Sequence, residues 1–342
     1  MNLKQVAKEL NVSISTVSKA LRDSHEISAE TKNAVLAKAK ELNYQVNPFA
    51  SGLRKQKTKT IAVVIPEVVN DFFGPVINGI ESIAQEKGYH VLIYLTHEDM
   101  EKEVAIINLL QNGRVDGVMI SISSQTSSTT HLEVLKEKGI PLVFFDRIVD
   151  YIDAPKVITD DQNCGALATE HLIENGCKRI AFLSISNKLS ITSKRMSGYL
   201  DALKKNKIKI DNSLVVLCDG DEVKNNHLIR KLLKRKDRPD GIFASVEHLA
   251  ILSYEICEEL KLNIPRDIKV ICFSNLKTAR LLNPSLTTIT QPAFEIGREA
   301  ASILFKLIEK KGHHFLLEKT TINSKLIKRI STEKTSGEKI TR

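Results

Sequence analysis

The sequence predicts an α/β protein in which a small helical domain precedes a larger core of parallel β-sheets. After residue 60, short β-branched runs such as TIAVVIP, PLVFFD and IKVICFS alternate with amphipathic segments, an order typical of βαβ units. Residues 1–46 show helical spacing and contain no such run. The 342 residues exceed the length of one hydrophobic core, so we expect more than one domain.

Three short helices are expected in residues 1–46. Asn11 tolerates a left-handed turn after the first, LKQVAKEL. Ser13 is the expected N-cap of the second, ISTVSKALR, and Ser28 that of the third, AETKNAVLAKAKEL. The apolar positions that would form their shared core are Leu3, Val6, Ala7, Leu10, Val17, Ala20, Leu21, Val35, Leu36, Ala39 and Leu42. Two such helices joined by a short turn form a helix-turn-helix, although other small helical bundles share this pattern.

The outward face of the second helix is rich in short hydroxyls, carries a cation and contains no acid. A solvated face usually carries Glu and Lys in pairs, whereas hydroxyls and a cation near a helix N-terminus suit phosphates and base edges of DNA. We interpret this face as a DNA-contacting surface rather than as a plain exposed one. The residues expected to contact DNA are Ser13, Ile14, Ser15, Thr16, Ser18 and Lys19.

Positive charge is concentrated at the same end of the chain. Residues 1–60 contain eleven lysines and arginines and five acids, so they carry +6 of the net charge of +9. A basic end on a nearly balanced body is expected of a protein that contacts nucleic acid, and a solubilising tail is the alternative.

Other patterns exclude several classes of protein. No apolar run is long enough to span a membrane and residues 1–10 lack the apolar region of a secretory signal, so we expect a cytoplasmic protein with no membrane partner. The five cysteines form no C-x-x-C pair and are expected to be buried, without zinc or disulfides. Phosphate-cradling and catalytic motifs are absent, so we predict no enzyme activity, no cofactor and no metal site.

The segments LKQVAKELNVSISTVSKAL and ISAETKNAVLAKAKELNYQVNPFASGLR resemble the DNA-binding headpiece of the LacI/GalR family of bacterial repressors, and the resemblance extends through most of the chain. It implies that Ile14, Ser15 and Lys19 read bases. It also implies that Thr16 and Ser18 contact phosphates or pack against the headpiece. The resemblance is specific because helix spacing, turn and the following segment agree together.

Residues 47–59 are expected to form a hinge. Asn47, followed by proline, can start a helix, but a helix of about seven residues that includes Gly52 is too short to be stable alone. The family resemblance implies that Asn47, at the junction of headpiece and hinge, contacts DNA. It also implies that the hinge becomes helical on the operator, where Leu53 opens a central base step from the minor groove and Arg54 lies near phosphates. Relatives usually have a longer side chain at the position of Gly52, so this hinge is expected to order less readily.

Beyond the hinge, the resemblance implies a core like that of periplasmic sugar-binding proteins, with two α/β lobes and three crossings of the chain between them. The cleft between the lobes would hold a small-molecule effector. The expected segments are a headpiece at 1–46, a hinge at 47–59, a core at 60–330 and a flexible tail at 331–342. Within the core, lobe 1 is expected at about 60–160 and 290–320, and lobe 2 at about 161–289 and 321–330.

Candidate effector contacts lie at the expected ends of strands, where ligands of α/β sheets bind. They are Phe72, Phe73, Asp146, Arg147, Asp160, Arg195, Glu247 and Asn275. One of the two adjacent phenylalanines is expected to stack on a ring unless both enter the core, and Asp160 is alternatively a helix cap. Arg195 is assigned because it aligns with an arginine that the family commonly points at its effector.

The resulting hypothesis is a homodimeric, ligand-responsive transcriptional regulator, expected to be a repressor, that binds a palindromic operator. The resemblance implies that its effector is a carbohydrate or a derivative. Val246–Glu247 and Ser274–Asn275 stand where many relatives have acids that bind sugar hydroxyls, which argues against a simple unmodified sugar. A dimer is favoured because residues 331–342 show no heptad repeat. The alternatives are a periplasmic ligand carrier and an α/β enzyme that uses Asp146, Asp160 and Asp161.

Overall fold

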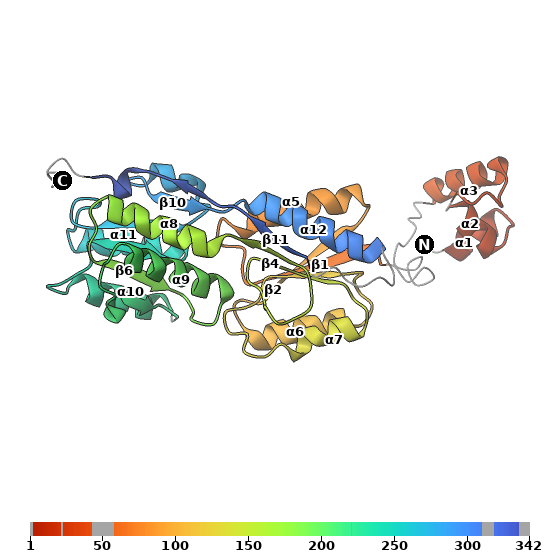
Figure 1. Ribbon diagram of the computed structural model, residues 1–342. Helices are drawn as coiled ribbons and strands as arrows, with labels where there is room; N and C mark the ends of the chain where they lie inside the picture. The colour runs from red at the N-terminus through yellow and green to blue at the C-terminus, as the bar shows by residue number, and fades with distance from the viewer. Residues whose placement is uncertain (1–2, 22, 43–57, 220, 310–317, 335–342) are drawn as a thin grey trace. The chain divides into compact units, whose positions relative to one another are not determined.

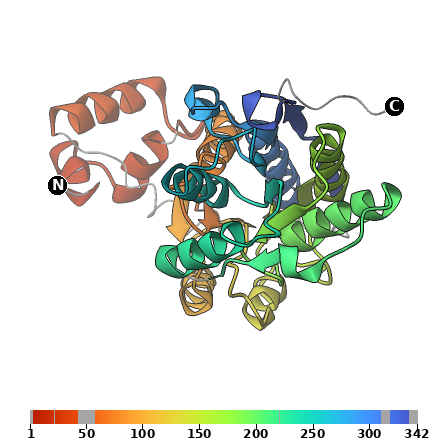
Figure 2. The same ribbon diagram turned by 90° about the vertical axis from the view of Figure 1, so that its left-hand side faces the viewer.

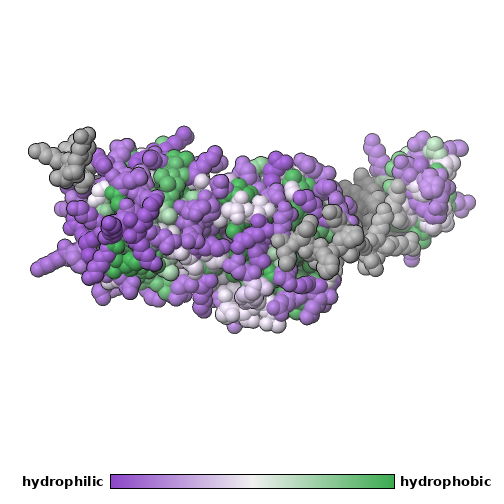
Figure 3. Space-filling model, in the orientation of Figure 1, coloured by the Kyte–Doolittle hydropathy of each residue, from purple (hydrophilic) through white to green (hydrophobic). Residues whose placement is uncertain are grey.

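The computed structural model describes residues 3–21, 23–42, 58–219, 221–309 and 318–334 and divides the chain into two compact units, Met1–Thr58 and Lys59–Arg342 (Figure 1). The candidate DNA contacts Asn47, Leu53 and Arg54 lie outside the described residues. Hydrophilic side chains cover most of the face in Figure 3. Within the described residues, no helix has the length and apolar character that a membrane span requires.

The described part of the N-terminal unit contains three helices, α1 (Leu3–Glu9), α2 (Ile14–Ala20) and α3 (Ala29–Glu41). Asn11 adopts a φ of 52° in the turn between α1 and α2, as predicted for a residue that tolerates the left-handed region. Both predicted caps are confirmed: the Ser13 hydroxyl accepts the Thr16 amide at 2.9 Å and the Ser28 hydroxyl accepts the Thr31 amide at 3.3 Å.

The core of this unit is formed by Val6, Ala7, Val17, Ala20 and Val35, with smaller contributions from Leu3, Leu10, Val12, Leu21, Ile27 and Leu42. The prediction that Leu36 joins this core is wrong, because its side chain is 52% exposed. On α3 the neighbouring Val35 occupies the inward position, and a helix turns successive side chains by about 100°, so both cannot face α1 and α2.

The described residues of the C-terminal unit form two six-stranded sheets, which confirms the predicted α/β class. The first has the order β11-β5-β4-β3-β1-β2 and is parallel throughout. Its strands are β1 (Thr60–Ile65), β2 (His90–Leu95), β3 (Val118–Ile120), β4 (Leu142–Phe145), β5 (Lys156–Thr159) and β11 (Lys319–Ile322). We call this sheet and its helices lobe 1.

The second sheet has the order β12-β10-β9-β8-β6-β7, in which β12 alone of the described strands is antiparallel. Its strands are β6 (Ile180–Ser184), β7 (Val215–Leu217), β8 (Gly241–Ala244), β9 (Lys269–Phe273), β10 (Thr287–Thr290) and β12 (Lys325–Ile327). We call this sheet and its helices lobe 2. All five cysteines are buried, as predicted, and none is bonded to another.

Helices cover both faces of each sheet (Figure 2). In lobe 1, α5 (Phe73–Glu86) and α12 (Ala293–Glu309) pack on one face, and α6 (Met100–Leu110) and α7 (Thr130–Glu137) on the other. In lobe 2, α8 (Asp161–Glu174) and α9 (Ser190–Lys205) cover one face, and α10 (Glu222–Leu233) and α11 (Glu247–Glu259) the other. The described 3-10 helices, η1 (Asn212–Leu214), η2 (Lys277–Leu281) and η3 (Ile330–Thr332), all lie in lobe 2. Each sheet is therefore buried on both sides, and its strands are correspondingly apolar.

The chain passes between the lobes three times, from β5 to α8, from β10 to α12, and from β11 to β12. After the last passage, Ser331 and Thr332 are buried in lobe 2, where the Ser331 hydroxyl donates to the Val270 carbonyl at 2.6 Å. This corrects the expectation that a flexible tail begins at residue 331. The segment is polar, but its hydroxyls find hydrogen-bond partners inside the lobe.

One pair of helices in each lobe is held at close range by glycines. Gly79 of α5 and Gly297 of α12 face each other's backbone, and a Cβ on either would press into a carbonyl oxygen of the opposite helix. Gly165 of α8 and Gly198 of α9 stand in the same relation in lobe 2. These contacts fix the spacing of the helices on one face of each sheet.

We expect Gly79→Ala to lower the free energy of unfolding of the core by about 1–3 kcal/mol, because its Cβ meets the backbone of α12, which cannot move like a flexible side chain. Gly74→Ala is the matched control on the same helix, since nothing lies within 4 Å of its Cβ position. Urea unfolding of both variants measures the difference. Equal transition midpoints for the two variants would contradict the close-packing argument.

Candidate functional site

The predicted DNA-contacting face of α2 is exposed, apart from partial burial of Thr16 and Ser18. Ile14 is 44% exposed although it is a large aliphatic residue. The hydroxyls of Ser13 and Thr16 lie 2.8 Å apart and form the N-terminal cap, so part of their hydrogen-bonding capacity is used within the helix. The Lys19 ammonium pairs with the Glu26 carboxylate. Both groups of that pair are about half exposed, so the pair is weak and open to exchange for a phosphate or base.

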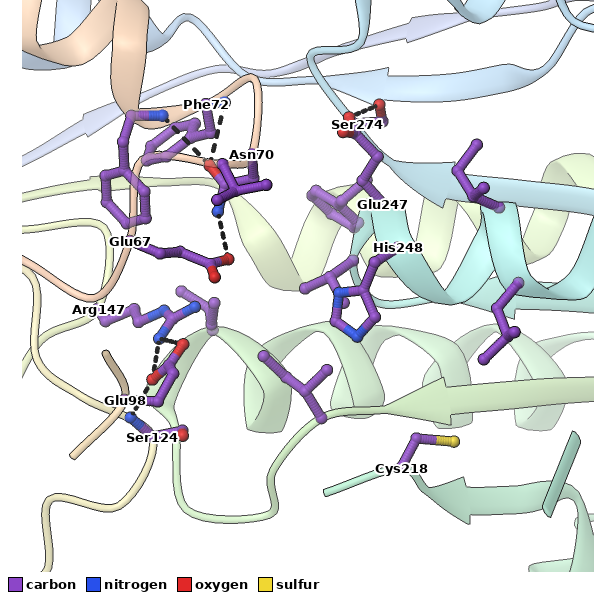
Figure 4. Close-up of a pocket in the computed structure, with 18 of the residues that line it drawn as sticks. Glu67, Asn70, Phe72, Glu98, Ser124, Arg147, Cys218, Glu247, His248 and Ser274 are labelled. Carbon is purple, nitrogen blue, oxygen red and sulfur yellow. Dashed lines mark hydrogen bonds and ion pairs between the residues drawn. The ribbon is translucent and has the colours of Figure 1, made fainter. Parts of the chain in front are cut away.

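In the C-terminal unit, a cavity of about 670 Å³ lies between the lobes, within the range of small-molecule sites. Figure 4 shows side chains from both lobes directed into it. Most of the polar side chains that line it follow the carboxyl ends of β1, β2, β3, β4, β7, β8 and β9. Parallel strands gather their carboxyl ends at one edge of a sheet, and here two such edges face each other.

The lobe 1 side of the cavity contains Asp146 and Arg147, which follow β4. Arg147 donates through Nη1 to both oxygens of Glu98, at 2.7 and 2.9 Å. Burial alone would raise the pKa of Glu98, but the Arg147 guanidinium outweighs burial and holds that pKa below its usual range. Among the described residues, the hydrogen bonds to the Asp146 carboxylate are long, 3.5 Å from the Ser121 hydroxyl and 3.4 Å from the Gln291 side-chain nitrogen.

Asp146 is an ionisable residue whose burial and backbone conformation are both energetically unfavourable. It is 6% exposed and adopts a φ of 59°, a region that non-glycine residues seldom occupy. Burial raises the pKa of its carboxyl to about 6, in spite of the opposing charges of Arg147 and Arg195. A carboxylate with open lone pairs at the floor of a cavity can accept hydrogen bonds from hydroxyl or ammonium groups of a ligand.

The lobe 2 side contains Arg195 of α9, whose donors are largely used inside its own lobe. Its Nε donates to Asp161 at 2.7 Å and its Nη1 donates to the Ser245 carbonyl at 2.6 Å. The guanidinium also lies 3.7 Å from the centroid of the Phe273 ring. Arg195, a predicted effector contact, therefore borders the cavity as part of a buried ion pair.

Glu247 and Asn275, both predicted, also line the cavity. The Ser274 hydroxyl donates to the Glu247 carboxylate, and burial raises the pKa of Glu247 against that hydrogen bond. The Asn275 side chain donates to the Gln291 carbonyl at 2.8 Å and accepts the Gln291 amide at 3.2 Å. Asn275 thus holds the crossing segment after β10 in place. Of the two side chains, Glu247 is therefore the more available to a ligand.

The two predicted phenylalanines lie at the border between cavity and core. Phe73 is 1% exposed and packs with its ring centroid 6.5 Å from that of Phe145, whereas Phe72 is 9% exposed. The two rings meet edge to face at 5.2 Å, and both touch the cavity. Phe72 is the more accessible of the two to a ligand ring.

The prediction for Asp160 is corrected by its position, because Asp160 is not among the described residues that line the cavity. One of its oxygens accepts the Ser324 amide at 2.8 Å, and the other accepts the Cys164 thiol at 3.4 Å. Asp160 and Ser324 belong to two crossings of the chain between the lobes, so the carboxylate ties these crossings together instead of facing a ligand.

Several residues that line the cavity were not predicted. They include Glu67, Asn70, Glu98, Ser124, His248 and Gln291. Glu67 and Glu98 each follow a lobe 1 strand within three residues, so the strand-end rule would have found them. His248 lies beside the predicted Glu247, and desolvation between the lobes lowers its pKa while Glu67 opposes that shift. No group of described His, Cys, Asp or Glu residues is placed to hold a metal ion.

Comparisons with known proteins agree with this architecture. Residues 2–47 match the profile of bacterial regulatory proteins of the lacI family, and residues 58–330 match that of periplasmic binding proteins and the sugar binding domain of the LacI family. Catabolite control protein A of Priestia megaterium is 30% identical over 307 residues, covering 90% of this chain and 92% of that protein. The ribose operon repressor of Halalkalibacterium halodurans is 32% identical over 309 residues, covering 90% and 91%.

Among solved structures, a complex of the transcriptional regulator CelR with cellobiose has a TM-score of 0.73 at 25% identity and covers 97% of this chain and 99% of its own. These relatives are regulators and not enzymes, so the alternative in which Asp146, Asp160 and Asp161 catalyse a reaction is set aside. The chain belongs to the LacI family of bacterial transcriptional repressors, with a helix-turn-helix DNA-binding domain and a core of the family's sugar-binding type.

Proposed function

We propose that this repressor binds a palindromic operator as a homodimer and responds to a small-molecule effector held between its core lobes. The observation that carries the proposal is the pairing of two features in one chain. The exposed face of α2 contains Ile14, Ser15 and Lys19 and no acid, and the core contains a cavity of about 670 Å³ lined by side chains from two lobes. A protein that works on operator DNA acts in the cytoplasm.

A carbohydrate or carbohydrate derivative is the effector class that fits best. Asp146, Glu247 and Asn70 offer acceptors and donors around the cavity, and Phe72 offers an apolar ring edge, a combination suited to a hydroxylated ring. The similar proteins include a ribose operon repressor and a regulator in complex with cellobiose, which supports this class.

An exposed sheet edge supports the proposed homodimer. Strand β2 is at the end of the lobe 1 sheet, and its Leu92 and Ile93 are 40% and 45% exposed. An uncovered edge with aliphatic side chains favours association with a second copy. A two-fold dimer would present two α2 helices to matched half-sites, which is why we expect a palindromic operator.

The effector would act by changing the relative population of open and closed lobes. It can shift that population only by its difference in affinity for the two states. Since its contacts come from both lobes, the closed state gains more of them. Closure would then change how well two headpieces and hinges fit the operator together.

We expect Lys19→Gln to weaken operator binding about tenfold, because one charge-assisted contact to a base or phosphate is lost. The matched control is Lys40→Gln, which removes one exposed lysine from α3 of the same unit. Fluorescence anisotropy with an operator selected from random-sequence duplexes measures both, over a range of salt concentrations. Equal losses for the two variants would mean that α2 contributes only general positive charge.

We expect Leu53→Ala to reduce operator affinity at least about tenfold, since Leu53 is proposed to open a base step from the minor groove. Effector affinity of the same variant should stay at the wild-type value, because the cavity is formed by residues of the C-terminal unit. Anisotropy and calorimetry test the two expectations separately. Unchanged operator affinity would refute the role of Leu53.

A further inference from the structure

The charge around the cavity is strongly negative. Seven carboxylate side chains of the described residues line it, against two arginines. Both arginines are already paired, Arg147 with Glu98 and Arg195 with Asp161, each at 2.7 Å. His248 adds little positive charge at neutral pH, because desolvation lowers its pKa. Glu98 and Asp146 lie within 4.0 Å of Arg147, and Asp219 pairs with Lys224. The cavity carboxylates without an ion pair among the described residues are Glu67, Glu222, Glu247 and Glu255.

The unpaired carboxylates come from both lobes and face each other. Glu67 follows β1 in lobe 1, Glu247 begins α11 in lobe 2, and Figure 4 shows the two on opposite sides of the cavity. Besides burial, the charge of Asp71 in lobe 1 raises the pKa of Glu247 in lobe 2. Like charges therefore repel across the cavity, and the repulsion opposes closure of the lobes.

The floor of the cavity contains a donor that the protein leaves unused. Nε of Arg147 is buried and has no hydrogen-bond partner among the described residues, and it lies 4.0 Å from a carboxylate oxygen of Asp146, too far for a hydrogen bond. The Arg147 side chain is only 5% exposed. Buried polar atoms are nearly always satisfied, so this donor indicates a ligand atom. A hydroxyl group can accept from Nε and donate to Asp146.

We propose that the effector is a hydroxylated amine of the amino-sugar class, with its ammonium group near Glu67 and Glu247 and a hydroxyl group between Arg147 and Asp146. The inference rests on the proposed function, in which this cavity holds the effector. A phosphorylated or carboxylated sugar does not fit, because an anion would enter a negative field in which both arginines are already paired. An ammonium group instead offsets the repulsion between the lobes, so its charge itself favours closure.

Isothermal titration calorimetry of the full chain tests the proposal with matched sugars. The probes are D-glucosamine, D-galactosamine and the deacetylated chitin disaccharide, each compared with its N-acetylated form and its parent sugar, together with glucose 6-phosphate. At least one amine should bind at least about tenfold more tightly than its neutral partners, with an affinity that falls as salt is raised. The proposal is overturned if a neutral or phosphorylated sugar binds more tightly, or if no amine binds.

Two substitutions test whether Glu67 and Glu247 provide the negative charge that binds the amine. Glu67→Gln and Glu247→Gln should each weaken binding of the amine about tenfold, while affinity for the parent sugar stays the same. The control is Glu258→Gln, an exposed residue of α11 that does not line the cavity, and it should change neither affinity. A loss that is equal for amine and parent sugar would assign the glutamates a structural role and overturn the proposal.

Operator binding of the same preparations, measured without sugar, distinguishes a failure of the amine proposal from a failure of the proposed repressor function. A chain that binds DNA and a neutral sugar refutes the amine and leaves the ligand-responsive repressor intact. A chain that binds the amine but no DNA duplex refutes the repressor function and supports the assignment of the cavity.

Discussion

Arg195→Met should lower the free energy of unfolding of the core by about 3–5 kcal/mol, because it removes one partner of a buried ion pair and leaves the other charged. Asp161 is 2% exposed, and apart from Arg195 its carboxylate accepts a hydrogen bond from the Thr159 hydroxyl of lobe 1, at 3.1 Å. The substitution also frees the Ser245 carbonyl and removes the contact with Phe273. Urea unfolding of the full chain, monitored on the core transition, measures the loss.

The double variant Arg195→Met, Asp161→Leu is the matched control. Removing both charges leaves no buried ion without a partner, so most of the lost stability should return. If the double variant is as unstable as Arg195→Met, the cost does not come from the orphaned carboxylate of Asp161. A stable double variant also permits a direct titration with effector, which separates the structural role of Arg195 from any contact with ligand.

Asp146→Asn should make the unliganded core more stable at neutral pH, by up to about 3 kcal/mol. The pKa of Asp146 is raised from 3.8 to about 6 in the folded core, so its ionised form is less favourable there than in the unfolded chain. Asparagine has no charge to desolvate and tolerates the left-handed backbone of this position. The same substitution should weaken effector binding, because the strongest acceptor at the floor of the cavity is lost.

The sign of the pH dependence follows from the raised pKa. Above pH 6 the folded core bears the full cost of the charged Asp146, and the cost fades as pH falls from 6 to 3.8, where the carboxyl is protonated in both states. The stability difference between variant and wild type should therefore be largest at pH 7 to 8 and shrink through this window. Taking the difference cancels the titration of the other groups. A constant difference between pH 5 and pH 8 would contradict the raised pKa.

The local features of the fold could be predicted from the sequence because their causes are local. Ser13 and Ser28 cap helices with amides three residues ahead, and Asn11 bends the chain by its own backbone preference. The alternation of apolar runs with amphipathic segments predicted parallel sheets, because strands that are buried on both faces are apolar at almost every position. Leu36 shows where this reasoning failed: helical spacing allowed two adjacent positions to face the core, and packing admitted one.

The candidate site was predicted only in part. Residues directly after strands, such as Asp146, Arg147 and Glu247, do line the cavity, because the ends of parallel strands define its walls. Asp160 also follows a strand, but that strand leads into a crossing between lobes, where its carboxylate binds the Ser324 amide. In the sequence, a residue that follows a strand into the cavity looks the same as one that follows a strand into a crossing between lobes. The sequence pattern does not show which loops lie together in the folded chain.

By itself, the sequence determined the class of the fold, the helix-turn-helix with its caps and the basic end of the chain, because these depend on spacing and composition. Its resemblance to known repressors indicated the family. Only the tertiary structure decided which charges remain available to a ligand. Arg195 and Asp161 are 34 residues apart and Arg147 and Glu98 are 49 apart, yet the members of each pair form an ion pair with each other. The free energy of an ionised group depends on its partners and its burial, and both are set by contacts between distant segments.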